Sequence, residues 1–254
     1  MFKEKLRLFV KKAIFGDKET YAFGDSTLLF KFGSRPIRRR YINSSSDVVR
    51  NDVLQINFFE KNFKSDDVLW DIGSHHGHYS LFAASVVTGE KQVYSFEPDS
   101  IARKIQVENI NLNRFGNKIT LSHAAVGRTT GILKFREMGG NANSHIFNES
   151  ESETSNIVEV ESVTLNSLIG GLPKPSIIKI DTEGAEIDIL SSATELIHDP
   201  SITFICELHP FAWSSYGVNY KQFESLLKDC GRNLQLLDPL KKVSDLPYYG
   251  TVIF

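Results

Sequence analysis

The sequence lacks the features that mark several specialised classes of protein. Its only cysteines in 254 residues are Cys206 and Cys230, too few for a disulfide framework or a cysteine-rich zinc site, which fits a reducing cytosol. No apolar run is long enough for a signal peptide or a membrane span. The net charge of −2 gives no basic field that would attract nucleic acid. We therefore expect a cytoplasmic protein without a nucleic-acid partner.

The first sixty residues differ from the rest of the chain. We expect them to form a helical cap extension (1–60) on one larger domain (61–254). Within residues 1–15, apolar side chains recur at helical spacing among lysines. This helix should pack on the domain, and peripheral contact with an anionic membrane is the alternative. With 41% apolar and 24% charged residues, the composition is typical of a soluble globular chain.

From Asp67 onward, short apolar runs alternate with helical patterns. This predicts a Rossmann-like α/β fold, in which a mostly parallel seven-stranded sheet carries helices on both faces. The expected strands are 68–71, 92–97, 119–123, 177–181, 202–208, 234–237 and 250–254. The expected helices are 77–87, 100–113, 185–193 and 220–230. An insertion at 131–163 should form a hairpin, and its polar loop, 139–156, should help to close over a substrate.

The segment from Val68 to Ser80 predicts a nucleotide-binding unit of strand, tight loop and helix. Its loop has Gly73 and Gly77 four residues apart, instead of the G-x-G-x-x-G of a dinucleotide-binding loop. Asp71 would also repel a pyrophosphate. S-adenosylmethionine carries ammonium and sulfonium groups and no phosphate, so it fits this loop better. The alternative is a plain strand-to-helix turn, in which Gly73 breaks the strand and Asp71 caps backbone groups.

A second carboxylate supports the nucleotide interpretation. Glu97 ends the next strand, where it can accept hydrogen bonds from both hydroxyls of a ribose. A charge at a strand end that simply faces water is the alternative. Neighbouring residues at the same edge complete the expected cofactor site: Ser74, His75, Pro98, His123 and Ala124. The small side chain of Ala124 would leave room for a flat adenine ring.

The fourth and fifth strands end in acids that should meet at the same edge of the sheet. Asp181 would lie beside the reacting atoms, and His209 or Asp181 would serve as the general base. Glu183 and Glu207 would hold acceptor hydroxyls, although Glu183 could equally be an acid favoured by a helix dipole. We expect no metal; an ion bridged by Asp181, Glu183 and Glu207 is the alternative. Lys179 lies inside an apolar strand and should reach one of these carboxylates.

Taken together, these segments resemble the FkbM family of S-adenosylmethionine-dependent methyltransferases. The resemblance covers roughly residues 50–210, and the segments that carry it are Trp70–Ser80, Tyr94–Pro98 with Asn109 and Asn113 downstream, Ala124–Gly127, Ile178–Glu186 and Glu207. The phrase Lys-Ile-Asp-Thr-Glu-Gly-Ala-Glu that ends at Glu186 is the most diagnostic part. His75 and His76 depart from the loop residues expected of the family.

The resemblance implies a class I methyltransferase fold with an antiparallel last strand, and methyl transfer to a hydroxyl oxygen of a sugar, a glycan or a small natural product. It assigns Asp71, Gly73 and Gly77 to the methionyl loop and Glu97 to the ribose. It assigns Asp181, Glu183 and Glu207 to the acceptor side. Two other functions are compatible with the same fold. One is a nicotinamide-dependent oxidoreductase, and the other is a non-catalytic module docked on a membrane through residues 1–15.

Overall fold

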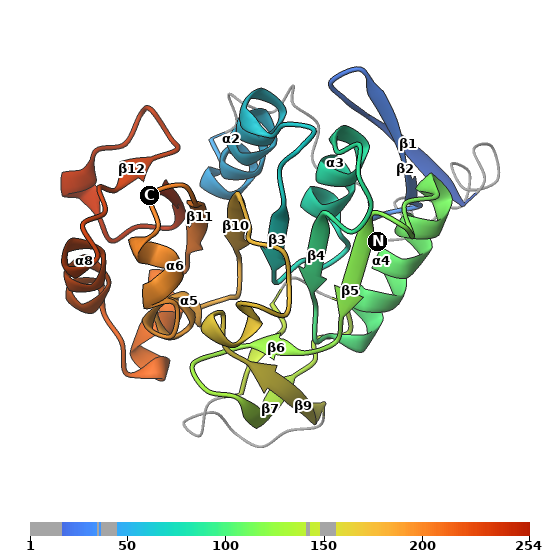
Figure 1. The fold of residues 1–254 in the computed structure, drawn as a ribbon. Coiled ribbons are helices and arrows are strands. Elements are labelled where there is room, and N and C mark those ends of the chain that lie inside the picture. Colours follow the sequence, from blue (N-terminus) through green and yellow to red (C-terminus); the bar gives the residue numbers. More distant parts are fainter. Residues whose placement is uncertain (1–16, 35, 37–44, 141–142, 148–155) are drawn as a thin grey trace.

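The computed structural model describes residues 17–34, 36, 45–140, 143–147 and 156–254. The strands of its central sheet are β3 (Leu69–Ile72), β4 (Val93–Phe96), β5 (Ile119–Ser122), β10 (Ile177–Ile180), β11 (Thr203–Leu208), β12 (Gln235–Leu236) and β13 (Gly250–Ile253). They lie in the order β12-β13-β11-β10-β3-β4-β5 (Figure 1). Neighbours from β11 to β5 are parallel, whereas β13 is antiparallel to both of its neighbours. The predicted sheet and the antiparallel last strand are therefore confirmed.

Helices cover both faces of this sheet, as predicted (Figure 1). One group is α2 (Asp47–Asn62), α3 (His78–Val86) and α4 (Ser100–Asn113). The other is α5 (Glu186–Ser191), α6 (Thr194–His198), α7 (Pro210–Trp213) and α8 (Tyr220–Asp229). Short 3₁₀ turns follow at Asn166–Leu168, Ser214–Tyr216 and Val243–Asp245. The sequence did not predict α2, α6 or α7.

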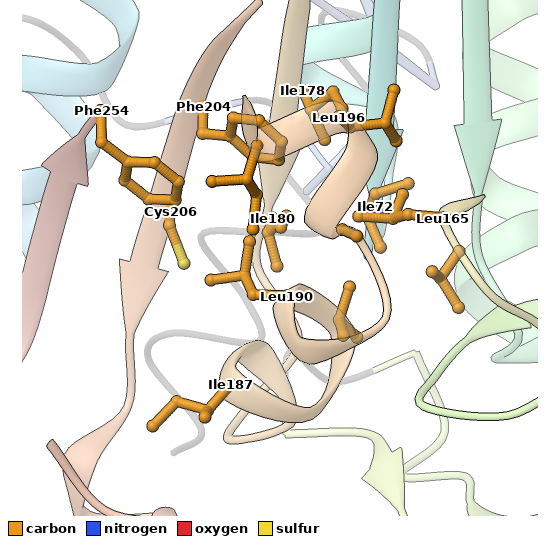
Figure 2. Packing of buried hydrophobic residues seen from close by; sticks show 14 of the residues in the cluster. Ile72, Leu165, Ile178, Ile180, Ile187, Leu190, Leu196, Phe204, Cys206 and Phe254 are labelled. Carbon is orange, nitrogen blue, oxygen red and sulfur yellow. The ribbon is translucent and has the colours of Figure 1, made fainter. Parts of the chain in front are cut away.

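Two apolar cores lie on opposite faces of the sheet because successive strand residues point to opposite sides. In β10, Ile177 packs in the core with α2 and α3, whereas Ile178 and Ile180 pack in the core with α5, α6 and α8 (Figure 2). Cys206 is buried in the second core. Lys179 shares the face of Ile177, so its ammonium is directed toward α3 and not toward α5.

A smaller sheet is inserted after β5. Its strands are β6 (Ala125–Val126), β7 (Gly131–Arg136), β8 (His145–Ile146) and β9 (Ile157–Val163), in the order β6-β9-β7-β8. β7 and β9 pair antiparallel over their lengths, and β6 pairs in parallel with β9. The two ends of the predicted insertion 131–163 thus lie side by side, below the central sheet in Figure 1. Residues 141–142 and 148–155 of its predicted loop lie outside the described residues.

The N-terminal region contains a hairpin that the sequence interpretation missed. β1 (Lys18–Phe23) and β2 (Ser26–Lys31) pair antiparallel around Gly24 and Asp25. Alternating apolar residues on both sides of this glycine-containing turn are a hairpin signal. The hairpin and α2 share one core with α3. The division of the chain into a cap extension (1–60) and a larger domain (61–254) stays a prediction. The expected helix at 1–15 lies outside the described residues. None of the helices that the structure describes has the length and apolarity to cross a bilayer.

Two asparagines on α4 fasten this hairpin to the rest of the fold. The side-chain amide of Asn113 accepts a hydrogen bond from the backbone N–H of Leu29 (2.8 Å) and donates one to its carbonyl (2.7 Å). Asn109 accepts from the N–H of Lys31 (2.7 Å) and donates to the carbonyl of His76 (3.0 Å). Because Asn109 is fully buried, it joins the hairpin directly to the glycine loop after β3.

We predict that Asn109→Ala lowers the free energy of unfolding by about 1–3 kcal/mol, because it leaves buried backbone groups without partners. Urea denaturation followed by circular dichroism measures this. Asn111→Ala is the matched control, since Asn111 is exposed on the same helix, and its midpoint should not change. Equal midpoints for the two variants would contradict the anchoring role of Asn109.

Candidate active site

A cavity of about 650 Å³ opens at the carboxyl ends of the central strands. Parallel α/β sheets bind ligands at this edge. Its walls come from the loops after β3, β4, β10 and β11, and also from α2, the inserted sheet and the segment before β13. The pocket brings together these predicted site residues: Gly73, Ser74, His75, Glu97, Pro98, Asp181, Glu183, Glu207 and His209.

The glycine loop after β3 requires glycine at two positions. Gly73 has a φ of +76°, and a Cβ there would lie 1.8 Å from the carbonyl oxygen of Asp181. Gly77 has a φ of +80° and precedes α3, and a Cβ there would lie 2.7 Å from the Cγ of Gln106. Only glycine adopts this left-handed backbone at little cost and leaves room for such close approaches. The loop is therefore packed against both β10 and α4.

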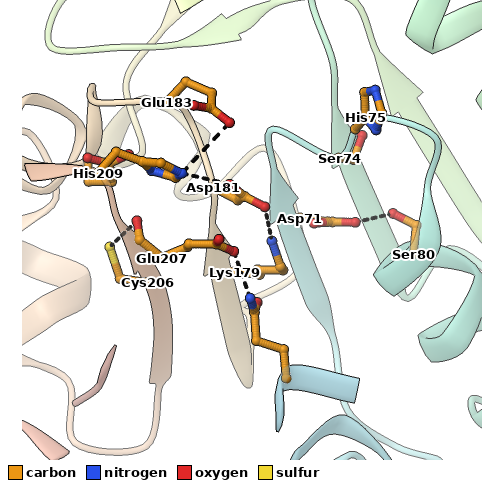
Figure 3. Close-up of polar contacts among 12 residues, drawn as sticks. Asp71, Ser74, His75, Ser80, Lys179, Asp181, Glu183, Cys206, Glu207 and His209 are labelled. Atoms are coloured by element: carbon orange, nitrogen blue, oxygen red, sulfur yellow. Dashed lines mark hydrogen bonds and ion pairs between the residues drawn. The ribbon is translucent and has the colours of Figure 1, made fainter. Parts of the chain in front are cut away.

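Asp71 lies behind this loop and does not line the pocket. Its carboxylate is fully buried and accepts a hydrogen bond from the hydroxyl of Ser80 on α3 (2.6 Å; Figure 3). Burial raises the pKa of Asp71, although the nearby charge of Lys179 opposes this. Asp71 therefore joins β3 to α3. It is the glycine loop between these two elements that faces the pocket.

Glu97 is buried at the opposite side of the glycine loop. One of its carboxylate oxygens accepts a hydrogen bond from the N–H of His75 (2.6 Å), and the other accepts from the N–H of Asp99 (2.8 Å). Burial raises the pKa of Glu97 to about 7. The ring of His75 donates to the carbonyl of Gly140 (2.8 Å), which ties the loop to the inserted segment. Glu97 therefore has a fixed orientation with lone pairs left for a ligand.

Four predicted cofactor residues do not line the pocket: Asp71, Gly77, His123 and Ala124. His123 is largely exposed and lies 3.8 Å from the carboxylate of Glu161, and Ala124 is buried outside the lining. Ala125 and Val126 line the pocket in their place, together with Phe96. Strand β5 ends at Ser122. The next residues along the chain that line the pocket are therefore those of β6.

At the other end of the pocket, Asp181 lies between two cationic groups (Figure 3). The ammonium of Lys179 donates to Asp181 Oδ2 at 2.9 Å, which confirms that Lys179 reaches a carboxylate. This ammonium also lies 4.5 Å from the ring centre of Tyr79. Burial opposes the charge of Asp181, but Lys179 and His209 hold its pKa below the usual value. Asp181 is therefore ionised at neutral pH.

His209 is 2% exposed, and its orientation is set from outside the pocket. Its Nδ1 donates to Glu186 (2.9 Å), which also accepts from the indole N–H of Trp213 (2.9 Å) and the N–H of Gly184 (2.8 Å). Burial disfavours the charged ring, but Glu186 and the surrounding carboxylates raise the pKa of His209 to about 10. Glu186 is in the first turn of α5, and the sequence interpretation missed its role in orienting His209.

Glu183 and Glu207 form, together with Asp181, the acidic end of the pocket. Glu183 has a left-handed backbone with a φ of +52°, uncommon for a residue with a side chain, and Oε1 lies 3.7 Å from His209 Nε2. Burial raises its pKa to about 7. The carboxylate of Glu207 accepts hydrogen bonds from Gln55 Nε2 (2.7 Å) and from the hydroxyl of Tyr249. Burial also raises the pKa of Glu207.

Four residues of this end were missed by the sequence interpretation: Asp52 and Gln55 on α2, Phe211 on α7, and Tyr249 before β13. Asp52, Phe211 and Tyr249 line the pocket, and Gln55 holds Glu207. Burial, and then the charges of Glu207 and Asp181, raise the pKa of Asp52 to about 7. No local motif marks these residues, because only tertiary packing brings α2 and the last loop to the sheet edge.

The acidic end also contains side chains that are able to bind a metal ion. Asp181, Glu207 and His209 each offer one ligand atom, and these atoms lie within 4.8 Å of one another. This set differs from the one considered from sequence, since His209 replaces Glu183. Such an ion would share Asp181 with Lys179, and it would require His209, whose pKa is about 10, to lose a proton.

Comparisons with known proteins identify relatives of this chain. A family model described as the methyltransferase FkbM domain matches residues 71–234. The chain is 26% identical over 195 residues to the hexuronic acid methyltransferase AglP of Haloferax volcanii, which covers 76% of this chain and 71% of that protein.

Solved structures of methyltransferases also resemble this chain, with TM-scores below 0.5. The methyltransferase FkbM of Methylobacillus flagellatus is 14% identical with a TM-score of 0.49; the match covers 83% of this chain but 55% of that one, so the chain spans about half its length. The precorrin-6y C5,15-methyltransferase of Geobacter metallireducens is 12% identical with a TM-score of 0.46, over 83% of this chain and 90% of that one.

The family model spans more than half of the chain and includes the glycine loop, Glu97, Asp181 and Glu207. It supports S-adenosylmethionine as the predicted cofactor and does not favour a nicotinamide cofactor. The chain belongs to the FkbM family of methyltransferases.

Proposed function

We propose that the protein transfers a methyl group from S-adenosylmethionine to a hydroxyl oxygen of a sugar. The observation that carries this proposal is the continuity of one cavity, which runs from the glycine loop and Glu97 to the acids Asp181, Glu183 and Glu207. Carboxylates accept hydrogen bonds from hydroxyls, and one of them can also accept a proton. The relative AglP is named for a sugar-type substrate, a hexuronic acid, which supports the sugar class.

The residues at the first end fit the cofactor. Backbone groups of the loop from Gly73 to Gly77, with Ser74 and His75, would hold the methionyl part. Glu97 would accept hydrogen bonds from both ribose hydroxyls, because each of its oxygens uses one lone pair on a backbone N–H. The apolar walls at Phe96, Pro98 and Val126 suit a flat adenine ring.

At the second end, the chain has to align a hydroxyl and remove its proton. S-adenosylmethionine, held by the glycine loop and Glu97, would supply an activated methyl group for transfer to the acceptor oxygen, with the sulfur as leaving group. The proton then goes to Glu183, which has no hydrogen-bonded partner among the described residues, whereas Lys179 holds one oxygen of Asp181. Asp181 and Glu207 orient the acceptor, and the His209 ring, held by Glu186, supports Asp181 and Glu183 from behind.

We predict that Glu183→Gln lowers kcat by about 10²–10⁴-fold, because the amide cannot accept the proton, while cofactor affinity is kept. Transfer of a labelled methyl group to sugars and calorimetry with S-adenosylhomocysteine measure the two effects. Glu195→Gln, an exposed change on α6, is the control. The product should resist mild alkali, as methyl ethers do. An alkali-labile methyl ester, or wild-type turnover by Glu183→Gln, would contradict the proposal.

Cofactor affinity should depend on pH through Glu97. With a pKa of about 7, its carboxylate is mostly ionised at pH 8 and mostly protonated at pH 6, where it cannot accept both ribose hydroxyls. We therefore expect S-adenosylhomocysteine to bind about tenfold more weakly at pH 6 than at pH 8. Calorimetry at both pH values measures this, with NAD as a ligand that should not bind. In Glu97→Gln, affinity should be low at both pH values; an unchanged pH dependence in this variant would exclude Glu97 as the cause.

A further inference from the structure

The acidic end of the pocket, which would bind the acceptor, is lined by more acidic than basic side chains. Four of its lining residues are acidic: Asp52, Asp181, Glu183 and Glu207. Among the lining residues that the structure describes, Lys179 is the one lysine or arginine. An anionic ligand would need a cationic partner here, since an unpaired charge in a buried site is costly.

Neither cationic side chain is available to such a ligand. Lys179 is 1% exposed, and its ammonium is held between Asp181 Oδ2 at 2.9 Å and the ring of Tyr79 at 4.5 Å. The ring of His209 is 2% exposed, bonded to Glu186 and directed at Asp181 and Glu183. Both positive groups therefore already compensate acids of this chain.

The remaining acids are placed to accept hydrogen bonds from a ligand. The side-chain carboxylate of Asp52 makes no hydrogen bond or ion pair with the residues that the structure describes, although Asp52 lines the pocket with Glu207. The carboxylate of Glu207 is fixed by Gln55 and Tyr249 and retains further lone pairs. Neighbouring hydroxyls, which a sugar ring presents, are the complementary donors.

An apolar side chain flanks these acids. Phe211 is 71% exposed at the pocket, and its ring meets the ring of His209 edge-on at a centroid distance of 5.7 Å. A large apolar side chain left exposed beside polar groups is typical of a contact surface for a ligand. The C–H face of a pyranose ring suits such a surface, while its hydroxyls face the acids.

We propose that the acceptor is an uncharged pyranose, whose hydroxyls bind Asp52 and Glu207, and that uronic acids are rejected by these carboxylates. This inference rests on the proposed methyl transfer to a sugar hydroxyl. It sets the chain apart from AglP, which is named for a hexuronic acid. Of the two carboxylates, Glu207 lies inside the segment 71–234 that matches the family model, and Asp52 lies outside it.

The test uses pairs of methyl glycosides that differ only at C6: glucose and glucuronic acid, galactose and galacturonic acid, mannose and mannuronic acid. Labelled S-adenosylmethionine is the donor. The assays are run at pH 8, where Asp52, with a pKa of about 7, is mostly ionised. Because like charges repel, we expect a kcat/KM at least about 100-fold higher for the neutral member of any pair that is methylated. Equal rates, a preferred uronide, or no transfer to any neutral glycoside by protein that binds S-adenosylhomocysteine would overturn the inference.

A matched pair of variants tests the role of Asp52. Asp52→Asn should raise the KM for the neutral glycoside and reduce the discrimination against the uronide by about tenfold, the effect of one charged contact. The affinity for S-adenosylhomocysteine should not change. Asp47→Asn removes the same charge from the same helix outside the pocket lining, and it should leave the discrimination as in the wild type. Unchanged discrimination in Asp52→Asn would overturn the assignment.

These outcomes separate the two proposals. Transfer to uronides alone, with an alkali-stable product, would overturn the neutral acceptor and leave sugar O-methylation in place. Absence of cofactor binding would instead remove the proposed function itself, and with it the present inference.

Discussion

The acidic end of the pocket depends on one buried cation. The Lys179 ammonium is almost fully enclosed in the middle of the sheet, where an uncompensated charge would cost many kcal/mol. Burial disfavours the charge, but the charges of Asp181, Asp71 and Glu207 and the hydrogen bond to Asp181 raise the pKa of Lys179. The ammonium also lies over the face of the Tyr79 ring. The same ammonium keeps Asp181 ionised. Removing either partner would leave the other charge buried and unpaired, which is more damaging than the loss of a surface ion pair.

The position of Lys179 also connects the two ends of the pocket. In the pairing of β10 with β3, Lys179 is opposite Asp71, and the next residues lead into the acceptor loop and the glycine loop respectively. The N–H of Asp181 donates to the carbonyl of Ile72 (3.0 Å), and Gly73 packs against the carbonyl of Asp181. A shift of one loop therefore displaces the other, so the register of two strands fixes the distance between methyl donor and acceptor.

Sequence patterns predicted those strands and site residues whose positions depend on residues close by in the sequence. Buried parallel strands are continuous apolar runs, so β3, β4, β10 and β11 were found, and with them the acids at their ends. The β1–β2 hairpin had a local signal around Gly24 that was missed. His123 was misplaced because the strand ends one residue earlier and the chain turns into β6. Asp52 and Tyr249 could not have been found this way, because their place in the site results from the packing of distant segments.

The origin of the acceptor residues suggests how specificity can change within the fold. The family segment supplies the glycine loop, Glu97 and Glu207, but the Glu207 carboxylate is held by Gln55 from α2 and by Tyr249 from the segment before β13. An acid of the common domain is thus oriented by two residues outside the matched segment. Under the proposed function, the orientation of Glu207 toward the acceptor depends on residues outside the matched segment. The glycine loop and Glu97, which would hold the cofactor, both lie inside it. We therefore expect substitutions of Gln55 and Tyr249 to change acceptor preference more than cofactor affinity.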